Sequence, residues 1–218
     1  MSRAKTINSR INYCQTQLAS LKEVDLSVQA QAMGLSVNHQ GQVPVTFLGR
    51  ELLVTNDALW AVDGSRVSVD AQSVVAHYLQ SRGRGRLSGQ FVPINRLTGI
   101  SVSPSSPSGN LVKPLEMIDG NYEKFTRAAV KIGGIIQGDS PSGAKSFLFG
   151  GLPYLPVKID FFESDEEFPF EIKLLFDSTA NIFASYECLE LYTMCLVVDV
   201  LMAGGWISDP DDCERSFL

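Results

Sequence analysis

The sequence predicts an α+β fold, an antiparallel sheet with helices packed mainly on one side. Three observations predict it. Apolar residues at helical spacing open the chain, two runs of alternating apolar residues lie at 157–162 and 170–176, and a long helical segment follows them. No internal repeat interrupts this order. We therefore expect a single domain over residues 1–218.

The amino-terminal part is expected to form a helical pair followed by a small sheet. A second short helix at 26–33 has Asp25 as its N-cap and Gly34 as its stop. The first helix is predicted by residues that recur every three or four positions, namely Ile7, Ile11, Cys14, Leu18 and Leu21. An antiparallel meander is predicted by three short β-rich runs, at 43–47, 51–55 and 58–62.

The middle of the chain combines two helices with its most linker-like stretch. A helix is predicted at 71–81, with Asp70 as its cap, and another at 122–132, which glycines stop. Residues 101–109 are rich in proline and serine, which disfavour both helix and strand. Because neither half has an evident core of its own, we interpret 101–109 as a surface loop within one domain.

The carboxy-terminal part has the clearest pattern. Apolar residues alternate with polar ones at 157–162 and again at 170–176, so two strands joined by a short polar loop form a β-hairpin. Helical sequence then runs over 178–203 with a break near Ser185, and two glycines end it.

Charge is distributed unevenly along the chain. The net charge is -6, and residues 1–113 carry 11 basic and 6 acidic side chains, whereas residues 114–218 carry 7 basic and 18 acidic ones. We expect no nucleic-acid partner, because the acidic half would repel a polyanion. We also expect no membrane partner, since Asp199 interrupts the longest apolar stretch, at 196–202. The first residues lack an apolar signal region, which predicts a cytoplasmic protein.

Four scattered cysteines give no disulfide framework and no Cys-x-x-Cys pair. Cys188 and Cys195 are seven residues apart and face the same side of one predicted helix. They are either two core residues or a pair of soft metal ligands, and the sequence leaves this open.

The predicted hairpin loop concentrates negative charge. Six of the 18 acidic residues after Lys113 lie between Asp160 and Glu171, with Asp165, Glu166 and Glu167 consecutive. Their mutual repulsion would be relieved by a cation or a basic partner, and hard cations prefer oxygen ligands. The alternative is a solvated turn, and the spacing matches no EF-hand.

Basic residues and a histidine supply further candidates. Arg82, Arg84 and Arg86 alternate with glycine and either grip a phosphate or carboxylate group or form a solvated helix end. His77 is either a ligand to a metal or tetrapyrrole or a simple hydrogen-bonding residue. The Gly-Asp-Ser-Pro-Ser-Gly segment at 138–143 has no histidine in a recognisable setting to serve as base, which favours a surface turn over a serine nucleophile.

Several stretches resemble an uncharacterised family of a domain of unknown function found in anaerobic bacteria and archaea. They are residues 47–51, 77–79, 87–89, 155–157, 165–169 and 175–178, including Asp-Glu-Glu-Phe-Pro and Leu-Phe-Asp-Ser. The resemblance implies one continuous domain and adds Asp177 to the candidate binding residues. Some members carry a cysteine-rich iron-sulfur module, which implies a redox or corrinoid-linked setting, although this chain lacks that module.

Three hypotheses about function follow. The first is a cytoplasmic binding or accessory domain whose acidic hairpin loop engages a partner or a cation. The alternative is an enzyme or carrier of anaerobic metabolism that binds a corrinoid, haem or iron-sulfur cofactor near His77, Cys188 or Cys195. The third is a homo-oligomer in which the basic half of one chain meets the acidic half of another.

Overall fold

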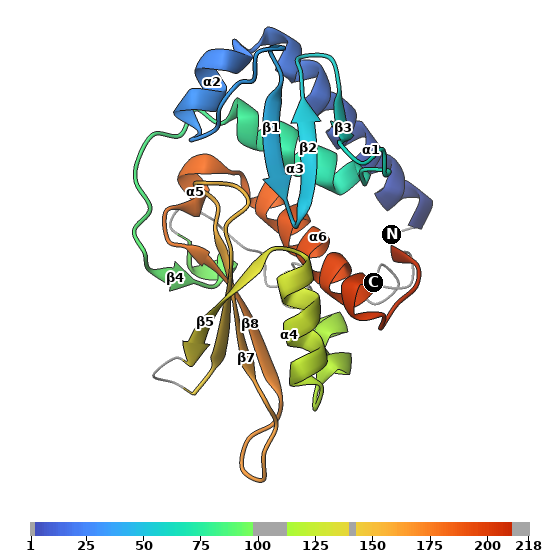
Figure 1. The fold of residues 1–218 in the computed structure, drawn as a ribbon, viewed down its shortest axis with the longest axis vertical. Coiled ribbons are helices and arrows are strands. Elements are labelled where there is room, and N and C mark those ends of the chain that lie inside the picture. The colour runs from blue at the N-terminus through green and yellow to red at the C-terminus, as the bar shows by residue number, and fades with distance from the viewer. Residues whose placement is uncertain (1–2, 98–112, 140–142, 211–218) are drawn as a thin grey trace.

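The computed structural model describes residues 3–97, 113–139 and 143–210 (Figure 1). It contains helices and two antiparallel sheets, so the predicted α+β class is confirmed. The strands divide between a three-stranded sheet, β1-β2-β3, and a five-stranded sheet with the order β4-β8-β7-β6-β5. The surface loop predicted at 101–109 lies outside the described residues.

The amino-terminal elements confirm the predicted helical pair and meander. Asp25 caps the second helix by accepting a hydrogen bond from the Val28 amide at 3.1 Å. The turn between β1 and β2 consists of Leu48 and Gly49, both with positive φ, which suits a tight hairpin. The elements are α1 (Arg3–Ser20), the 3-10 helix η1 (Leu21–Glu23), α2 (Leu26–Ala32), β1 (Val43–Phe47), β2 (Arg50–Val54), β3 (Leu59–Ala61) and α3 (Val69–Gln80).

The predicted cap of α3 is wrong. The helix begins at Val69, and the Oγ of Ser68 accepts the amide hydrogen bond of Ala71 at 3.2 Å. Asp70 lies in the first turn, where its carboxylate is paired with Arg10 of α1 instead. A serine three residues before a free amide caps a helix as well as an aspartate does, and the Asp70 carboxylate is engaged by Arg10.

The five-stranded sheet contains the predicted hairpin at its centre. It is formed by β7 (Val157–Phe162) and β8 (Glu171–Asp177), which pair with Ile159 opposite Leu174. The sequence did not predict β4 (Phe91–Val92), β5 (Gly134–Asp139) or β6 (Lys145–Phe149). Two 3-10 helices, η2 (Ile94–Arg96) and η4 (Lys113–Ile118), complete this part of the described chain.

Three further helices confirm the helical segments predicted at 122–132 and 178–203. They are α4 (Tyr122–Lys131), α5 (Ala180–Phe183) and α6 (Tyr186–Gly204). The predicted break near Ser185 is the N-cap of α6, where the Ser185 Oγ accepts from the Cys188 amide at 3.3 Å. Gly205, with φ of +67°, ends the helix in the left-handed conformation.

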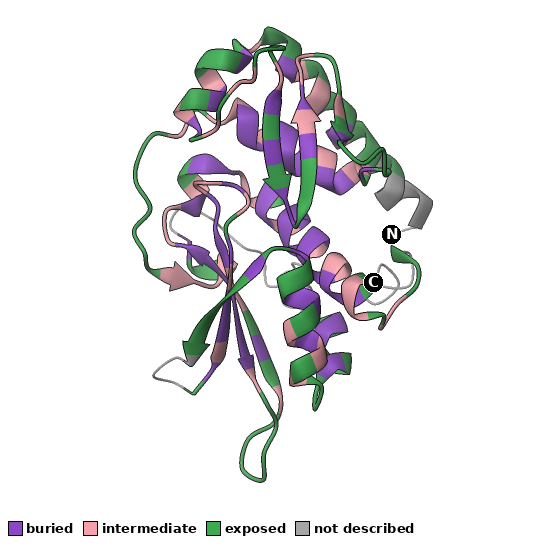
Figure 2. Cartoon of the chain, viewed as in Figure 1, coloured by how far each residue is buried: buried purple, intermediate pink, exposed green. Residues whose placement is uncertain are grey.

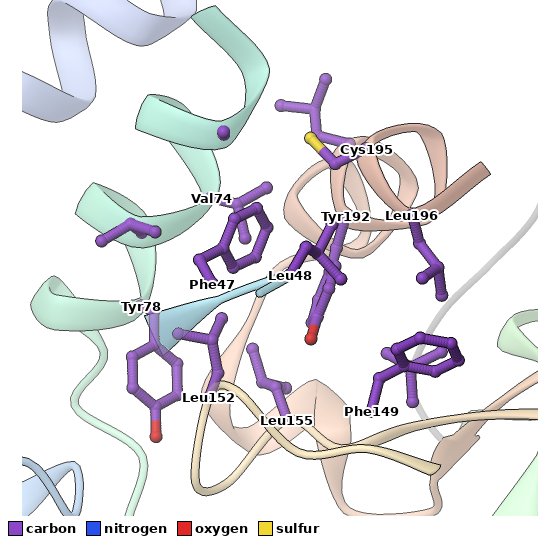
Figure 3. Packing of buried hydrophobic residues seen from close by; sticks show 14 of the residues in the cluster. Phe47, Leu48, Val74, Tyr78, Phe149, Leu152, Leu155, Tyr192, Cys195 and Leu196 are labelled. Carbon is purple, nitrogen blue, oxygen red and sulfur yellow. The ribbon is translucent and has the colours of Figure 1, made fainter. Parts of the chain in front are cut away.

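Helix α6 lies between the two sheets and packs against α3 and α4. The ring of Tyr192 contacts Phe47 of β1, with centroids 5.1 Å apart, and Phe176 of β8, at 6.3 Å. Figure 3 shows Tyr192, Cys195 and Leu196 of this helix among side chains from β1, α3 and the segment after β6. Most buried apolar residues of both sheets belong to one continuous cluster.

Removing the hydroxyl group of Tyr192 is expected to stabilise the fold. The Oη atom is buried and has no hydrogen-bond partner among the described residues, so its desolvation is uncompensated. We expect Tyr192→Phe to raise the free energy of unfolding by about 1 kcal/mol, measured by urea denaturation. Tyr78→Phe is the matched control, because the Tyr78 hydroxyl donates to the Met33 carbonyl at 2.8 Å and accepts from the Tyr154 amide at 3.0 Å.

The Tyr78→Phe variant is expected to lose about 1–2 kcal/mol. A similar loss in both variants would show that the Tyr192 hydroxyl has a partner.

Candidate functional site

A pocket of about 520 Å³ opens between α1, β2, α3 and the second half of α6. This volume lies within the range of small-molecule sites. One wall is apolar and is built from Ile11, Phe47, Met194 and Val198. Charged side chains also line it, namely Arg10, Arg50, Arg66, Asp70, Asp199 and Asp209. The pocket therefore offers an apolar surface beside a row of polar groups.

Local structure fixes the position of each charged group. Arg50 is the first residue of β2 and follows the tight Leu48–Gly49 turn. Asp199 lies one helical turn beyond Cys195 on α6, and Asp70 lies in the first turn of α3. The elements come from distant parts of the sequence and meet where the small sheet and α6 approach each other (Figure 1).

The first ion pair of the pocket is close and largely buried. The guanidinium group of Arg10 donates from Nε to Asp70 Oδ1 at 2.9 Å and from Nη2 to the other carboxylate oxygen. The Asp70 side chain is 9 % exposed. A two-point contact of this kind holds both side chains in place, so this pair forms a fixed part of the wall.

The second ion pair is much looser. Nη2 of Arg50 lies 3.8 Å from Asp199 Oδ1, and Nη1 of the same arginine donates to the Arg66 carbonyl at 3.4 Å. Burial raises the pKa of Asp199 to about 6, because the attraction of Arg50 offsets only part of the cost of desolvating the carboxylate. The Asp199 carboxyl group therefore changes its charge near neutral pH.

Replacing Asp199 by asparagine is expected to stabilise the protein at alkaline pH. The carboxyl binds its proton more tightly in the folded state than in the unfolded chain, so its ionisation lowers stability as pH rises from about 4 through 6. We expect Asp199→Asn to be more stable than the wild type by about 1–3 kcal/mol at pH 8, and by much less at pH 4.5. Urea unfolding at both pH values measures this, and an equal difference at the two would contradict it.

The imidazole of His77 is engaged within the fold at both nitrogens. Nε2 accepts a hydrogen bond from the Ser185 amide at 3.2 Å, and Nδ1 lies 3.1 Å from the Tyr13 hydroxyl. Because the amide can only donate, Nδ1 carries the proton and donates to Tyr13. Burial lowers the pKa of His77, which favours this neutral form. As placed, the ring does not fit the role of a metal or tetrapyrrole ligand, because neither nitrogen is available.

Both candidate cysteines lie inside α6. Cys188 and Cys195 are buried, and desolvation raises the pKa of each thiol, so neither is a thiolate at neutral pH. Within residues 3–97, 113–139 and 143–210, no group of three or more histidine, cysteine or acidic side chains is placed to hold a metal ion.

The acidic loop is an ordered turn that projects from the end of the β7–β8 hairpin. Asp165 Oδ1 accepts hydrogen bonds from the amides of Glu167, at 2.8 Å, and Phe168, at 2.7 Å. Ser164 ties the base of the loop to the carboxylate of Asp119. Glu166 and Glu167 are exposed, and Phe168 is 66 % exposed. Figure 2 shows the loop at the end of the β7–β8 hairpin coloured as exposed. One carboxylate thus shapes the turn, and two others remain at its surface.

The arginine run lies elsewhere, on the connection between α3 and β4. Arg82, Arg84 and Arg86 are all exposed. Figure 1 shows this connection on one side of the molecule, well away from the hairpin loop. The structure therefore does not bring the arginines and the carboxylates of Asp165–Glu167 into one cleft.

Asp177 is enclosed by donors from its own chain. Its side chain is fully buried, and its carboxylate accepts five hydrogen bonds. The donors are the amides of Ser88, Gly89 and Thr179 and the hydroxyls of Ser88 and Thr179. These contacts give this predicted binding residue a structural position, joining the end of β8 to the segment that leads into β4.

Sequence reasoning did not predict the pocket. Its charged groups come from α1, β2, the segment before α3, α3 itself, α6 and the segment after α6, and no short motif unites them. One signal was present, because Asp199 interrupts an otherwise apolar run on a buried helix. A charge in such a position requires either a partner or access to a cavity, and here it has both.

Fold and pocket together define an α+β structure with a charged, partly apolar pocket. The chain belongs to the family of the domain of unknown function DUF3786, whose family model matches residues 25–199. The matched region contains Arg50, Arg66 and Asp199, whereas Arg10 precedes it. Comparison with curated proteins and with solved structures gave no match. Among the described helices, none is long and apolar enough to cross a bilayer.

Proposed function

We propose that this chain is a binding domain whose pocket between α1, β2, α3 and α6 takes a small molecule with an apolar body and a polar head. The observation that carries the proposal is the pairing, in one cavity of about 520 Å³, of an apolar wall with the loosely held Arg50–Asp199 pair. An apolar cavity with a few converging polar groups is the usual form of a ligand site.

Different side chains of the pocket would contact the apolar body and the polar head of the ligand. Ile11, Phe47 and Met194 would cover the apolar body, which gains from leaving water. The close Arg10–Asp70 pair would keep the shape of the pocket, and Arg50 with Asp199 would contact the head. The cytoplasmic location and the anaerobic setting that the family resemblance implies remain predictions alongside this proposal.

Methionine-methyl NMR of the whole chain tests the proposal with simple probes. Met194 lines the pocket, whereas Met202 on the same helix does not. We expect millimolar hexanol or hexanoate to shift the Met194 methyl signal and to leave that of Met202 in place. Val198→Trp, which places a large side chain in the pocket beside Met194, is expected to weaken the shift. A Met194 signal that responds to neither probe would overturn the proposal.

A second candidate function uses the acidic hairpin loop to engage a partner or a cation. The exposure of Phe168 between surface carboxylates, in a turn held by Asp165, favours it. Titration with calcium tests the cation form of this proposal through the backbone amide signals of Glu166 and Glu167. We expect saturable shifts that Glu166→Gln weakens. Unchanged amide signals at about 10 mM calcium, roughly ten-fold above the dissociation constants of weak extracellular sites, would rule out the cation form.

The charge distribution also supports a version of this proposal in which the partner of the acidic loop is a second copy of the chain. The arginine run and the acidic loop lie apart in one chain, so they would pair only between copies. Such an interface would be sensitive to salt. We expect sedimentation velocity to show oligomers at low ionic strength that dissociate on adding salt, and a monomer at low salt would remove this form.

The cofactor alternative is not favoured by the geometry of its candidate ligands. His77 would have to give up its bonds to Ser185 and Tyr13 before either ring nitrogen could bind a metal. Cys188 and Cys195 of α6 are buried in the hydrophobic core. A corrinoid, haem or iron-sulfur group held by these residues would therefore require the packing between α3 and α6 to change.

A further inference from the structure

The three arginines of the pocket differ in how far their charge is satisfied. Arg10 is held by two hydrogen bonds to Asp70. Arg50 reaches only a carboxylate oxygen at 3.8 Å and a carbonyl at 3.4 Å, both longer than the 2.7–2.9 Å or so of a strong charge-assisted bond. Arg66 is exposed, and in the described part of the chain its guanidinium group has neither a hydrogen bond nor an ion pair.

Arg50 and Arg66 are neighbours at the pocket, since Arg50 donates to the Arg66 backbone carbonyl. Both side chains line the same cavity. Two guanidinium groups with free donors are the usual means of binding a carboxylate or phosphate group. Arg10, already paired with Asp70 through two hydrogen bonds, is not expected to contribute.

Asp199 stands beside these donors and would repel an anion while it is ionised. Its side chain faces Arg50 from α6, and the other charged groups around the pocket are Arg10, Arg66, Asp70 and Asp209. Arginines keep their charge throughout the physiological range, and Asp70 is held by Arg10. Burial places the pKa of Asp199 at about 6, so its neutral form is accessible at little cost. A neutral carboxyl group donates a hydrogen bond instead of repelling an oxyanion.

We propose that the pocket binds the oxyanion head of a small amphipathic molecule, with Arg50 and Arg66 as its cationic contacts and Asp199 taking up a proton as the head enters. The inference rests on the proposed function, because it names the class of ligand for the same pocket. The arginines attract the head, and the protonated Asp199 donates to it. Binding and protonation therefore strengthen each other.

Matched six-carbon probes test this inference in the whole chain. Hexanoate and hexyl phosphate carry an oxyanion, and hexanol is their neutral counterpart. Binding of each probe is followed through the Met194 methyl signal. We expect both oxyanions to bind at least ten-fold more tightly than hexanol. A stronger response to one of the two oxyanions identifies the kind of head that the pocket prefers.

The pH dependence separates proton uptake from simple charge attraction. If the head requires neutral Asp199, hexanoate affinity falls about 20-fold between pH 5.5 and 7.5, as expected for a group with a pKa of about 6. Asp199→Asn is expected to make the affinity for hexanoate independent of pH. Hexanol binding is expected to be independent of pH in both proteins.

Arginine variants identify the cationic contacts. Arg50→Gln and Arg66→Gln are expected to weaken hexanoate binding at least ten-fold and hexanol binding much less, because hexanol carries no charge for the arginines to attract. Arg127→Gln, which removes an exposed arginine of α4 outside the pocket, is the control and is expected to change neither.

The outcomes of the two proposals are distinguishable. Hexanol binding as tight as hexanoate binding, or hexanoate binding without pH dependence, would overturn the oxyanion inference and leave the small-molecule pocket standing. A Met194 signal that responds to none of the three probes would overturn the pocket itself.

Discussion

Replacement of Asp177 by asparagine is expected to lower the free energy of unfolding by about 3 kcal/mol. The two carboxylate oxygens accept hydrogen bonds from three amides and two hydroxyls, and the side chain is fully buried. Asparagine has the same shape but turns one acceptor into a donor. The NH2 group of asparagine then replaces one carboxylate oxygen and points at the groups that donated to that oxygen. Those buried donors lose their acceptor.

Acid is expected to produce the same weakening in the wild type. Burial by itself would raise the pKa of Asp177, but the hydrogen bonds from Thr179, Ser88 and Gly89 outweigh it and lower the pKa. The stabilisation is therefore present above the unfolded-state value of about 4 and is lost as pH falls below it. Urea unfolding at neutral pH measures the effect of Asp177→Asn.

Glu166→Gln at the exposed hairpin loop is the control for this variant. It is expected to change the free energy of unfolding by less than about 0.5 kcal/mol. An equally small effect of Asp177→Asn would show that the connection between α3 and β4 does not depend on this carboxylate.

Replacement of Gly83 by alanine is expected to cost about 2–3 kcal/mol of stability. A Cβ atom at Gly83 would lie 2.3 Å from the carbonyl oxygen of Ile182, a backbone atom that can move only if α5 moves. Gly85 provides a control within the same arginine run, because the nearest atom to its Cβ is a ring carbon of Phe183 at 3.8 Å.

Gly85→Ala is expected to be nearly neutral, within about 0.5 kcal/mol. Thermal or urea unfolding of the two variants measures the contrast. Equal effects would show that the two glycines act through chain flexibility and not through the close packing of Gly83.

These two predictions concern the two ends of one connection. Gly83 fixes its start against α5, and Asp177 fixes its end through Ser88 and Gly89. The arginines alternate with glycines in the sequence, but the backbone that carries them is held at both ends. Arg82, Arg84 and Arg86 are therefore exposed on a segment that is anchored at both ends.

Strong local patterns accounted for most elements that the sequence predicted. The alternation at 157–162 and 170–176 identified β7 and β8, and the helical spacing from Ile7 to Leu21 identified α1. In each of these elements the spacing of apolar residues along the chain is regular enough to identify the element locally.

The missed strands lack such a pattern. Glycines at both ends of the apolar pair Ile135–Ile136 indicated turns, yet the segment forms β5 because β6 pairs with it. Strand β4 has only two residues and exists through its pairing with β8. Their structure depends on partners distant in sequence, which local propensity does not encode.

The same reasoning applies to the candidate site. The acidic loop and the arginine run were found because their charges are consecutive or alternate, which is visible along the chain. The pocket needs Arg50 and Asp199, which are 149 positions apart and meet only after β2 and α6 have packed. Only the unusual placement of Asp199 in an apolar helix gave a local sign of it.

The position of α6 between both sheets has a consequence for biosynthesis. Phe47, in the first sheet, finds its aromatic partner in Tyr192, which the ribosome adds 145 residues later. A nascent chain that ends before α6 must leave the apolar faces of β1 and α3 uncovered. We expect such truncated chains to bind chaperones or to aggregate. The apolar faces of the amino-terminal half are expected to be covered only when α6 has left the ribosomal exit tunnel.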